Sequence, residues 1–107
     1  MQRWFETYDY LVTPTLSRTA LPIDQDLFEP ITIDGVEVGE LRRNWFPYTM
    51  PFNITGHPAL TLCCGYDSEG LPIGLQIVGR FRDDASVLRA AALYESSEDW
   101  LSRRPEL

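Results

Sequence analysis

Few side chains of this 107-residue chain could act as nucleophiles, bases or metal ligands. It has one histidine, His57, and two cysteines, the adjacent Cys63 and Cys64. A cysteine beside a histidine can perform acyl transfer, and the same residue types bind zinc. Adjacent cysteines lack the spacing of zinc ligands, however, and buried strand cysteines usually behave as small hydrophobic residues. We therefore expect no metal site, and a structural role for His57 in its loop.

Lysine is absent from the sequence, and the nine basic residues are all arginines. The other candidates for catalysis are therefore serines and acidic residues. Arginine stays protonated and cannot act as a general base. A serine hydroxyl is a weak nucleophile without an adjacent base. The acidic residues of positions 24–40 are typical of a solvated surface rather than of paired catalytic carboxylates. The sequence therefore predicts no catalytic residue. The six serines are Ser17, Ser68, Ser86, Ser96, Ser97 and Ser102.

Two short apolar runs, residues 59–64 and 73–78, form the most regular part of the sequence. Residues 65–71 between them carry Asp, Ser and Gly, which favour a turn. This pattern predicts a hairpin of two largely buried strands. Gly74 and Gly79 lack a Cβ atom, so they allow another backbone to approach closely or the chain to bend, at some cost to strand stability. In regular strands, Cys63 and Cys64 would point to opposite faces, which disfavours a disulfide between them.

The remaining elements are predicted from local patterns. We expect a helical turn at residues 2–7, a strand at 10–13 that stops at Pro14, and mostly loop at 15–30. Residues 31–38 alternate around Asp34-Gly35, which predicts a small peripheral hairpin. A helix at 40–46 and an irregular stretch at 47–58 follow. Residues 83–97 predict an amphipathic helix that packs on the sheet, with Asp83 or Asp84 as its N-cap.

Several of these segments resemble a known family. Residues 53–60, Asn-Ile-Thr-Gly-His-Pro-Ala-Leu, and residues 70–79, Gly-Leu-Pro-Ile-Gly-Leu-Gln-Ile-Val-Gly, closely resemble the carboxyl-terminal part of the amidase signature family. Residues 8–15 resemble its strand that ends in a Pro-Thr loop, and residues 83–100 resemble its closing helix. Residues 18–43 match loosely. The family usually has proline where this chain has Cys63. The end of the strand predicted at residues 59–64 therefore need not follow the family's geometry.

This resemblance implies a hydrolase of the carbon–nitrogen bonds of amides that needs no cofactor. The family uses a Ser-cisSer-Lys triad, and no triad residue can be carried over to this chain. We therefore expect residues 1–107 to form a single α/β domain that is the carboxyl-terminal fragment of an amidase-type mixed sheet flanked by helices. Such a fragment is expected to be inactive alone. The resemblance places Thr15, Phe52, Asn53 and Thr55 as candidates for the substrate pocket, although a structural role is favoured for Asn53.

Aromatic residues are numerous for so short a chain. We expect most of them to pack in the core, and those near the family motifs to line a pocket. The set comprises Trp4, Phe5, Tyr8, Trp45, Phe46, Tyr48 and Phe52.

Two other functions remain open. The chain can be a complementing subunit that adds strands to a separate polypeptide carrying the triad, or a binding module that self-associates through its strand edges. A net charge of −7 and a pI near 4.5 disfavour nucleic acids and anionic membranes as partners. The sequence has no apolar run of the roughly 20 residues that span a bilayer and no export signal. We therefore expect a cytoplasmic protein.

Overall fold

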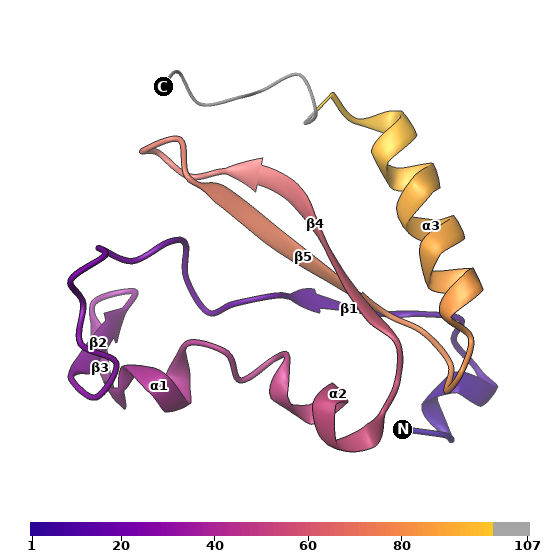
Figure 1. Ribbon diagram of the computed structural model, residues 1–107, viewed down its shortest axis with the longest axis horizontal. Helices are drawn as coiled ribbons and strands as arrows, with labels where there is room; N and C mark the ends of the chain where they lie inside the picture. The colour runs from indigo at the N-terminus through magenta and orange to yellow at the C-terminus, as the bar shows by residue number, and fades with distance from the viewer. Residues whose placement is uncertain (100–107) are drawn as a thin grey trace.

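The computed structural model describes residues 1–99, which form a three-stranded antiparallel sheet with helices on both faces (Figure 1). The strand order is β1 (Leu11–Pro14), β5 (Pro72–Val78) and β4 (Ala59–Tyr66). The last strand of the described residues, β5, is therefore the central one, and β1 and β4 run parallel to each other on either side of it. The predicted α/β class is confirmed. None of the helices in residues 1–99 has the length and apolar character needed to cross a membrane.

Strands β4 and β5 form the predicted hairpin, which closes at residues 67–71. Leu62 is the only buried residue in β4. This strand lies at an edge of the sheet within the described residues. The hairpin is therefore less buried than predicted. The register shifts where Cys63 pairs with Gly74 and Gly65 pairs with Ile73. The residue between Cys63 and Gly65 forms a β-bulge, which interrupts the regular alternation assumed for the two cysteines. Both cysteines are free.

One face of the sheet is covered by α3 (Asp84–Ser97), as predicted (Figure 1). Ile77 and Leu62 of the hairpin pack there against Val87 and Ala91 of the helix. The helix begins where the Asp83 carboxylate accepts a hydrogen bond from the backbone N–H of residue 86, 3.2 Å away, which confirms the expected cap.

The opposite face is covered by α2 (Met50–Thr55) and the short 3₁₀ helix η1 (Trp4–Glu6). Val78 points to this face because its neighbour Ile77 points to the other, and it packs against Phe52 and Phe5. The prediction of an irregular segment at residues 47–58 is wrong. Pro51 suits the first turn of α2, and Gly56 ends the helix with a positive φ of 68°.

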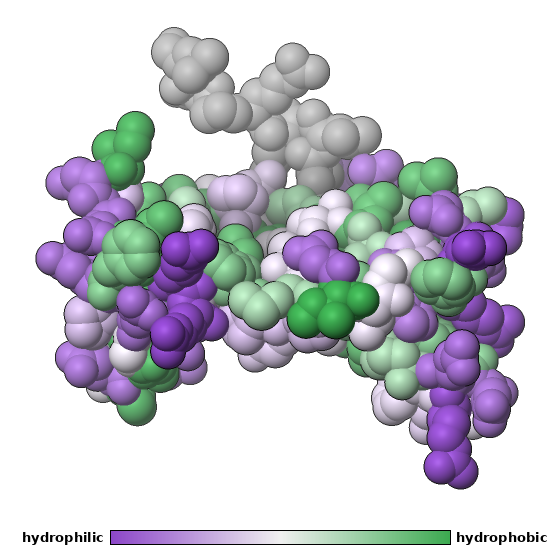
Figure 2. Space-filling view, turned by 60° about the horizontal axis from the view of Figure 1, so that its bottom comes forward, coloured by the Kyte–Doolittle hydropathy of each residue, from purple (hydrophilic) through white to green (hydrophobic). Residues whose placement is uncertain are grey.

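A separate hairpin, β2 (Pro30–Ile33) and β3 (Val36–Glu40), leads into α1 (Leu41–Asn44). Asp34 and Gly35 both have positive φ angles, 49° and 79°, as the turn of a tight two-residue hairpin requires. The predicted peripheral hairpin is confirmed, and the helix after it is shorter than the predicted residues 40–46. Figure 2 brings forward the side that carries α1 and α2, where hydrophobic surface lies among hydrophilic residues.

Candidate functional site

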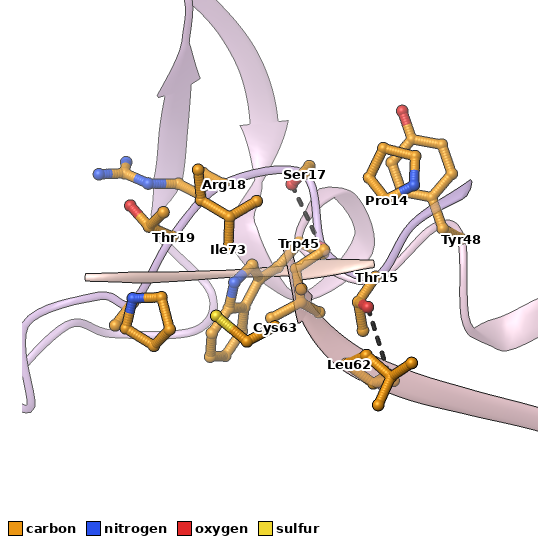
Figure 3. A pocket seen from close by; sticks show the side chains of 15 residues that line it. Pro14, Thr15, Ser17, Arg18, Thr19, Trp45, Tyr48, Leu62, Cys63 and Ile73 are labelled. Atoms are coloured by element: carbon orange, nitrogen blue, oxygen red, sulfur yellow. Dashed lines mark hydrogen bonds between the residues drawn. The ribbon is translucent and has the colours of Figure 1, made fainter. Parts of the chain in front are cut away.

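A cavity of about 660 Å³ lies where the end of β1 meets the β4–β5 hairpin (Figure 3). Its volume falls within the range of roughly 300–1,000 Å³ that is typical of small-molecule sites. Segments far apart in sequence build it, namely residues 14–20, Trp45, Tyr48, residues 61–63 and residues 72–74.

The floor of the cavity is a contact between two threonines across the central strand. Thr15 follows β1, and its backbone N–H donates to the Gly74 carbonyl over 2.9 Å. Its hydroxyl donates to the Thr61 hydroxyl of β4 at 3.2 Å. A Cβ atom on Gly74 would stand 2.8 Å from the Thr15 Oγ1 atom and 3.2 Å from Thr61 Cγ2. The two threonine side chains can therefore meet above β5 because position 74 is glycine. The close neighbours at this position are side chains and not the second backbone that the glycine was expected to admit.

Gln76 connects this sheet face to the aromatic wall. It is 3% exposed and lies in the row between Thr13 of β1 and Thr61 of β4. Its Nε2 atom donates to the Thr13 hydroxyl at 3.0 Å and to the Tyr48 carbonyl at 2.9 Å. Both amide hydrogens thus hold neighbouring segments in place. An amide residue within an otherwise apolar strand is the sequence signal that points to this role.

Hydrogen bonds fix the loop of residues 15–20 at its start. The backbone N–H of Ser17 donates to the Trp45 carbonyl at 3.0 Å, and its hydroxyl donates to the Asn44 carbonyl at 2.6 Å. The Asn44 amide in turn donates to the Val38 carbonyl of β3 at 2.8 Å. The peripheral hairpin therefore has a role at the site, because it sets the position of Trp45 in the cavity wall.

The far end of this loop interacts with the turn between β4 and β5. A hydrogen bond from the Thr19 side chain, and then one from the backbone N–H of Leu71, lower the pKa of the Asp67 carboxyl group. The carboxylate also accepts from the Glu69 backbone N–H at 2.9 Å. Hydrogen bonds to the ionised form account for this direction.

The potential nucleophiles near the cavity are not activated. The hydroxyl hydrogen of Ser17 points to a backbone carbonyl. Cys63 lines the cavity, and its Sγ atom donates to the Gly65 carbonyl at 3.4 Å. Burial, followed by the neighbouring Cys63, raises the pKa of the Cys64 thiol. Because the thiolate is the reactive form, this raised pKa favours the inert thiol at neutral pH.

The structure places the predicted pocket residues in different surroundings. Thr15 lines the cavity, whereas Phe52 is buried in the core beneath α2. Asn53 and Thr55 are exposed on α2, and neither lines this cavity. A role in substrate binding stays a prediction for all four. Two wall residues, Trp45 and Cys63, were not singled out as site residues, because nothing local in the sequence shows that their segments meet.

His57 packs between aromatic rings. Its ring stacks on Phe5 with centroids 5.4 Å apart and meets the edge of Phe81 at 5.9 Å. The Nδ1 atom lies 3.0 Å from the Thr55 hydroxyl. Within residues 1–99, no group of three or more His, Cys, Asp or Glu side chains is placed to hold a metal ion.

The family model described as "Amidase" matches residues 1–88, which is most of the chain. The chain belongs to the amidase family. The resemblance found in the motifs of residues 53–60 and 70–79 is thereby confirmed.

Individual amidases support this assignment. An acylamidase of Rhodococcus erythropolis is 40% identical over 98 residues, which cover 92% of this chain and 20% of the acylamidase. A glutamyl-tRNA(Gln) amidotransferase subunit of Chloroflexus aggregans is 40% identical over 103 residues, or 96% of this chain and 19% of that protein. A bacterial aryl acylamidase of the amidase signature family superimposes with a TM-score of 0.79 at 30% identity, over 99% of this chain and 23% of its own. The chain thus spans about a fifth of the length of these curated relatives.

Proposed function

We propose that this chain is the carboxyl-terminal part of an amidase that hydrolyses carbon–nitrogen bonds. In this proposal it supplies strands of the sheet and one wall of the substrate pocket, and the Ser-cisSer-Lys triad belongs to another part of the catalytic unit. The observation that carries the proposal is the cavity floor of Thr15, Gly74 and Thr61, since two of these residues lie in segments that resemble the family. The two free cysteines of the chain support the proposal of a reducing, cytoplasmic location.

The chain alone is proposed to be inactive. Amide hydrolysis by a serine requires an adjacent base and donors that stabilise the oxyanion. The sequence contains no lysine, and the serine in the cavity wall, Ser17, donates its hydrogen to a carbonyl. A pocket wall without these groups binds an amide and does not cleave it.

We expect the purified chain to release no aniline from acetanilide and no ammonia from short aliphatic amides above the buffer rate. The Ser17→Ala variant serves as the control for the serine of the cavity, and it should give the same rate. Turnover that follows the chain through successive purification steps and disappears in Ser17→Ala would refute the proposed inactivity.

A second candidate is a subunit that completes a separate amidase polypeptide. It is favoured by the two outer strands, because β1 and β4 each have an edge without a partner strand among the described residues. Such edges can accept strands from another chain. A neighbouring gene that encodes the Gly/Ser-rich triad segment as its own reading frame would support this candidate, and an in-frame continuation upstream of Met1 would exclude it.

A further inference from the structure

Strand β4 has one edge without a partner strand among the described residues, and the backbone groups on that edge can be assigned. The Gly79 backbone N–H donates to the Pro58 carbonyl at 2.9 Å, so position 58 faces β5. In an antiparallel pair, positions that bond to the partner strand alternate with positions that do not. The two leucines of β4 therefore bond to β5. The N–H and C=O groups that point outward belong to Ala59, Thr61 and Cys63.

This edge lacks the usual protection against pairing with another chain. Exposed edge strands commonly carry a charged residue or a proline, and residues 59–63 contain neither. A bulge follows Cys63, so the regular stretch is residues 59–63 and its centre is Thr61. The free edge of β1 is different. Within β1, only Val12 offers both backbone groups outward, because Pro14 has no N–H.

An exposed apolar flank of α3 lies on the same side of the molecule as this edge (Figure 1). Val87 faces the sheet, and its neighbours Ser86 and Leu88 are rotated by about 100° to opposite flanks of the helix. The Ser86 flank faces the segment before β1, because the Tyr10 hydroxyl donates to the Ser86 carbonyl at 3.0 Å. The flank of Leu88, which is 59% exposed, therefore faces the β4 side. Exposed Ala92 continues this flank one turn later.

The edge and the flank are both self-complementary under a two-fold axis. In an antiparallel pairing of two copies centred on Thr61, this residue lies opposite its counterpart, and Ala59 lies opposite Cys63. Every outward N–H then meets a C=O of the other copy. The axis is perpendicular to the sheet, so both α3 helices lie on the same face and their Leu88 flanks approach each other. The small side chain of Ala92 leaves room for this approach.

We propose that the β4 edge and the Leu88 flank of α3 form a two-fold interface between two copies of this chain. The two three-stranded sheets join into one continuous sheet, and the β1 edge is left for the rest of the catalytic unit. Such isologous pairing is the commonest form of soluble oligomer. The proposal goes beyond the amidase function, because a monomeric chain would leave the family assignment and the proposed inactivity untouched.

The molar mass of the full chain in solution tests the interface. We expect a dimer at micromolar concentrations that dissociates on dilution, measured by sedimentation equilibrium. Each copy has a net charge of −7, so association should tighten as added salt screens the repulsion. A monomer at all micromolar concentrations in high salt would overturn the proposal. So would species that keep growing beyond the dimer, because a two-fold interface is closed.

Two variants at position 63 test the strand edge. Cys63→Pro removes an outward N–H and leaves the bonds between β4 and β5 intact, because this position does not bond to β5. We expect it to weaken dimerisation at least about tenfold, since one hydrogen bond is lost at each end of the symmetric pairing. Cys63→Ala removes the same thiol but keeps the N–H, so it should dimerise like the unmodified chain. Equal dimerisation of the two folded variants would overturn the proposal.

Two charge substitutions test the helix flank, and they keep the proposal testable where Cys63→Pro fails to fold. Leu88→Glu places like charges against each other across the two-fold axis, and we expect it to weaken dimerisation at least about tenfold because a charge is buried without a partner. Leu93→Glu adds the same charge at an exposed position on the side of α3 that faces away from the sheet, and it should leave dimerisation unchanged. Equal weakening by both variants would assign the effect to net charge and overturn the proposed flank.

Discussion

Gly74 connects the sequence motif to the cavity at the scale of a single residue. It lies in the central strand, directly beneath the contact between Thr15 and Thr61. Any side chain here would occupy the space in which the two hydroxyl groups meet. The glycine is therefore explained by the approach of the Thr15 and Thr61 side chains over β5, and not by a turn.

We predict that Gly74→Ala destabilises the chain by about 1–3 kcal/mol, because the new Cβ atom forces the threonines or the strand to move. Urea unfolding followed by circular dichroism measures this change. Gly65→Ala is the matched control in the same hairpin, since a Cβ atom there meets nothing within 4 Å. That control should be neutral or stabilising by up to about 1 kcal/mol, because it restricts the unfolded chain. Equal destabilisation of the two variants would contradict the crowding of position 74 by Thr15 and Thr61.

At the scale of elements, the turn between β4 and β5 holds the cavity loop through Asp67. The Thr19 side chain and then the Leu71 backbone N–H lower the pKa of this carboxyl group in the folded state. The usual pKa of an aspartate in an unfolded chain is about 3.9. The ionised carboxylate therefore contributes stability above that pH, and this contribution is lost as the pH falls through the lower folded pKa.

We expect the stability advantage of the unmodified chain over Asp67→Asn to be greatest above about pH 4 and to shrink as the pH is lowered toward about 2. Asparagine keeps the acceptor oxygen but cannot titrate. Urea midpoints across this pH range measure the difference. Glu69→Gln removes the same charge from the same turn and is the control. A difference for Asp67→Asn that does not change with pH would show that the folded pKa is not lowered.

Local signals predicted most of the elements, and they failed where tertiary contacts decide. Asp83 caps α3 and Asp34-Gly35 closes the peripheral hairpin, because each signal acts within a few residues. Helix α2 was missed although Pro51 and Gly56 are typical of a helix start and end. It is short, and the burial of Phe52 against Val78 contributes to it, which no local pattern reveals.

Local sequence patterns could not predict the cavity, for a related reason. The predicted hairpin pairs β4 with β5, but the sequence does not show that β1 pairs with the other edge of β5. Only this arrangement brings Thr15 to Thr61. Trp45 likewise reaches the cavity through hydrogen bonds between its segment and Ser17. Thr15 became a pocket candidate through the family resemblance, because the residue pattern alone does not indicate a pocket at this position.

At the scale of the whole molecule, large apolar side chains are exposed on several elements. Ile54 on α2 is 80% exposed and Leu93 on α3 is 72% exposed, so both faces of the molecule carry such residues. Figure 2 shows hydrophobic surface on the side of α1 and α2. This surface, the edges of β1 and β4 that have no partner strand among the described residues, and a span of about a fifth of its relatives support the proposed role as part of a larger amidase.

The most direct test of this account is the activity of a chimaera in which this chain replaces the matching segment of the Rhodococcus erythropolis acylamidase. We predict that the chimaera folds and hydrolyses an acyl amide, since the chain restores strands and a pocket wall while the acylamidase retains its catalytic groups. A chimaera that unfolds cooperatively on heating, yet shows no hydrolysis under conditions in which the parent acylamidase is active, would contradict the account.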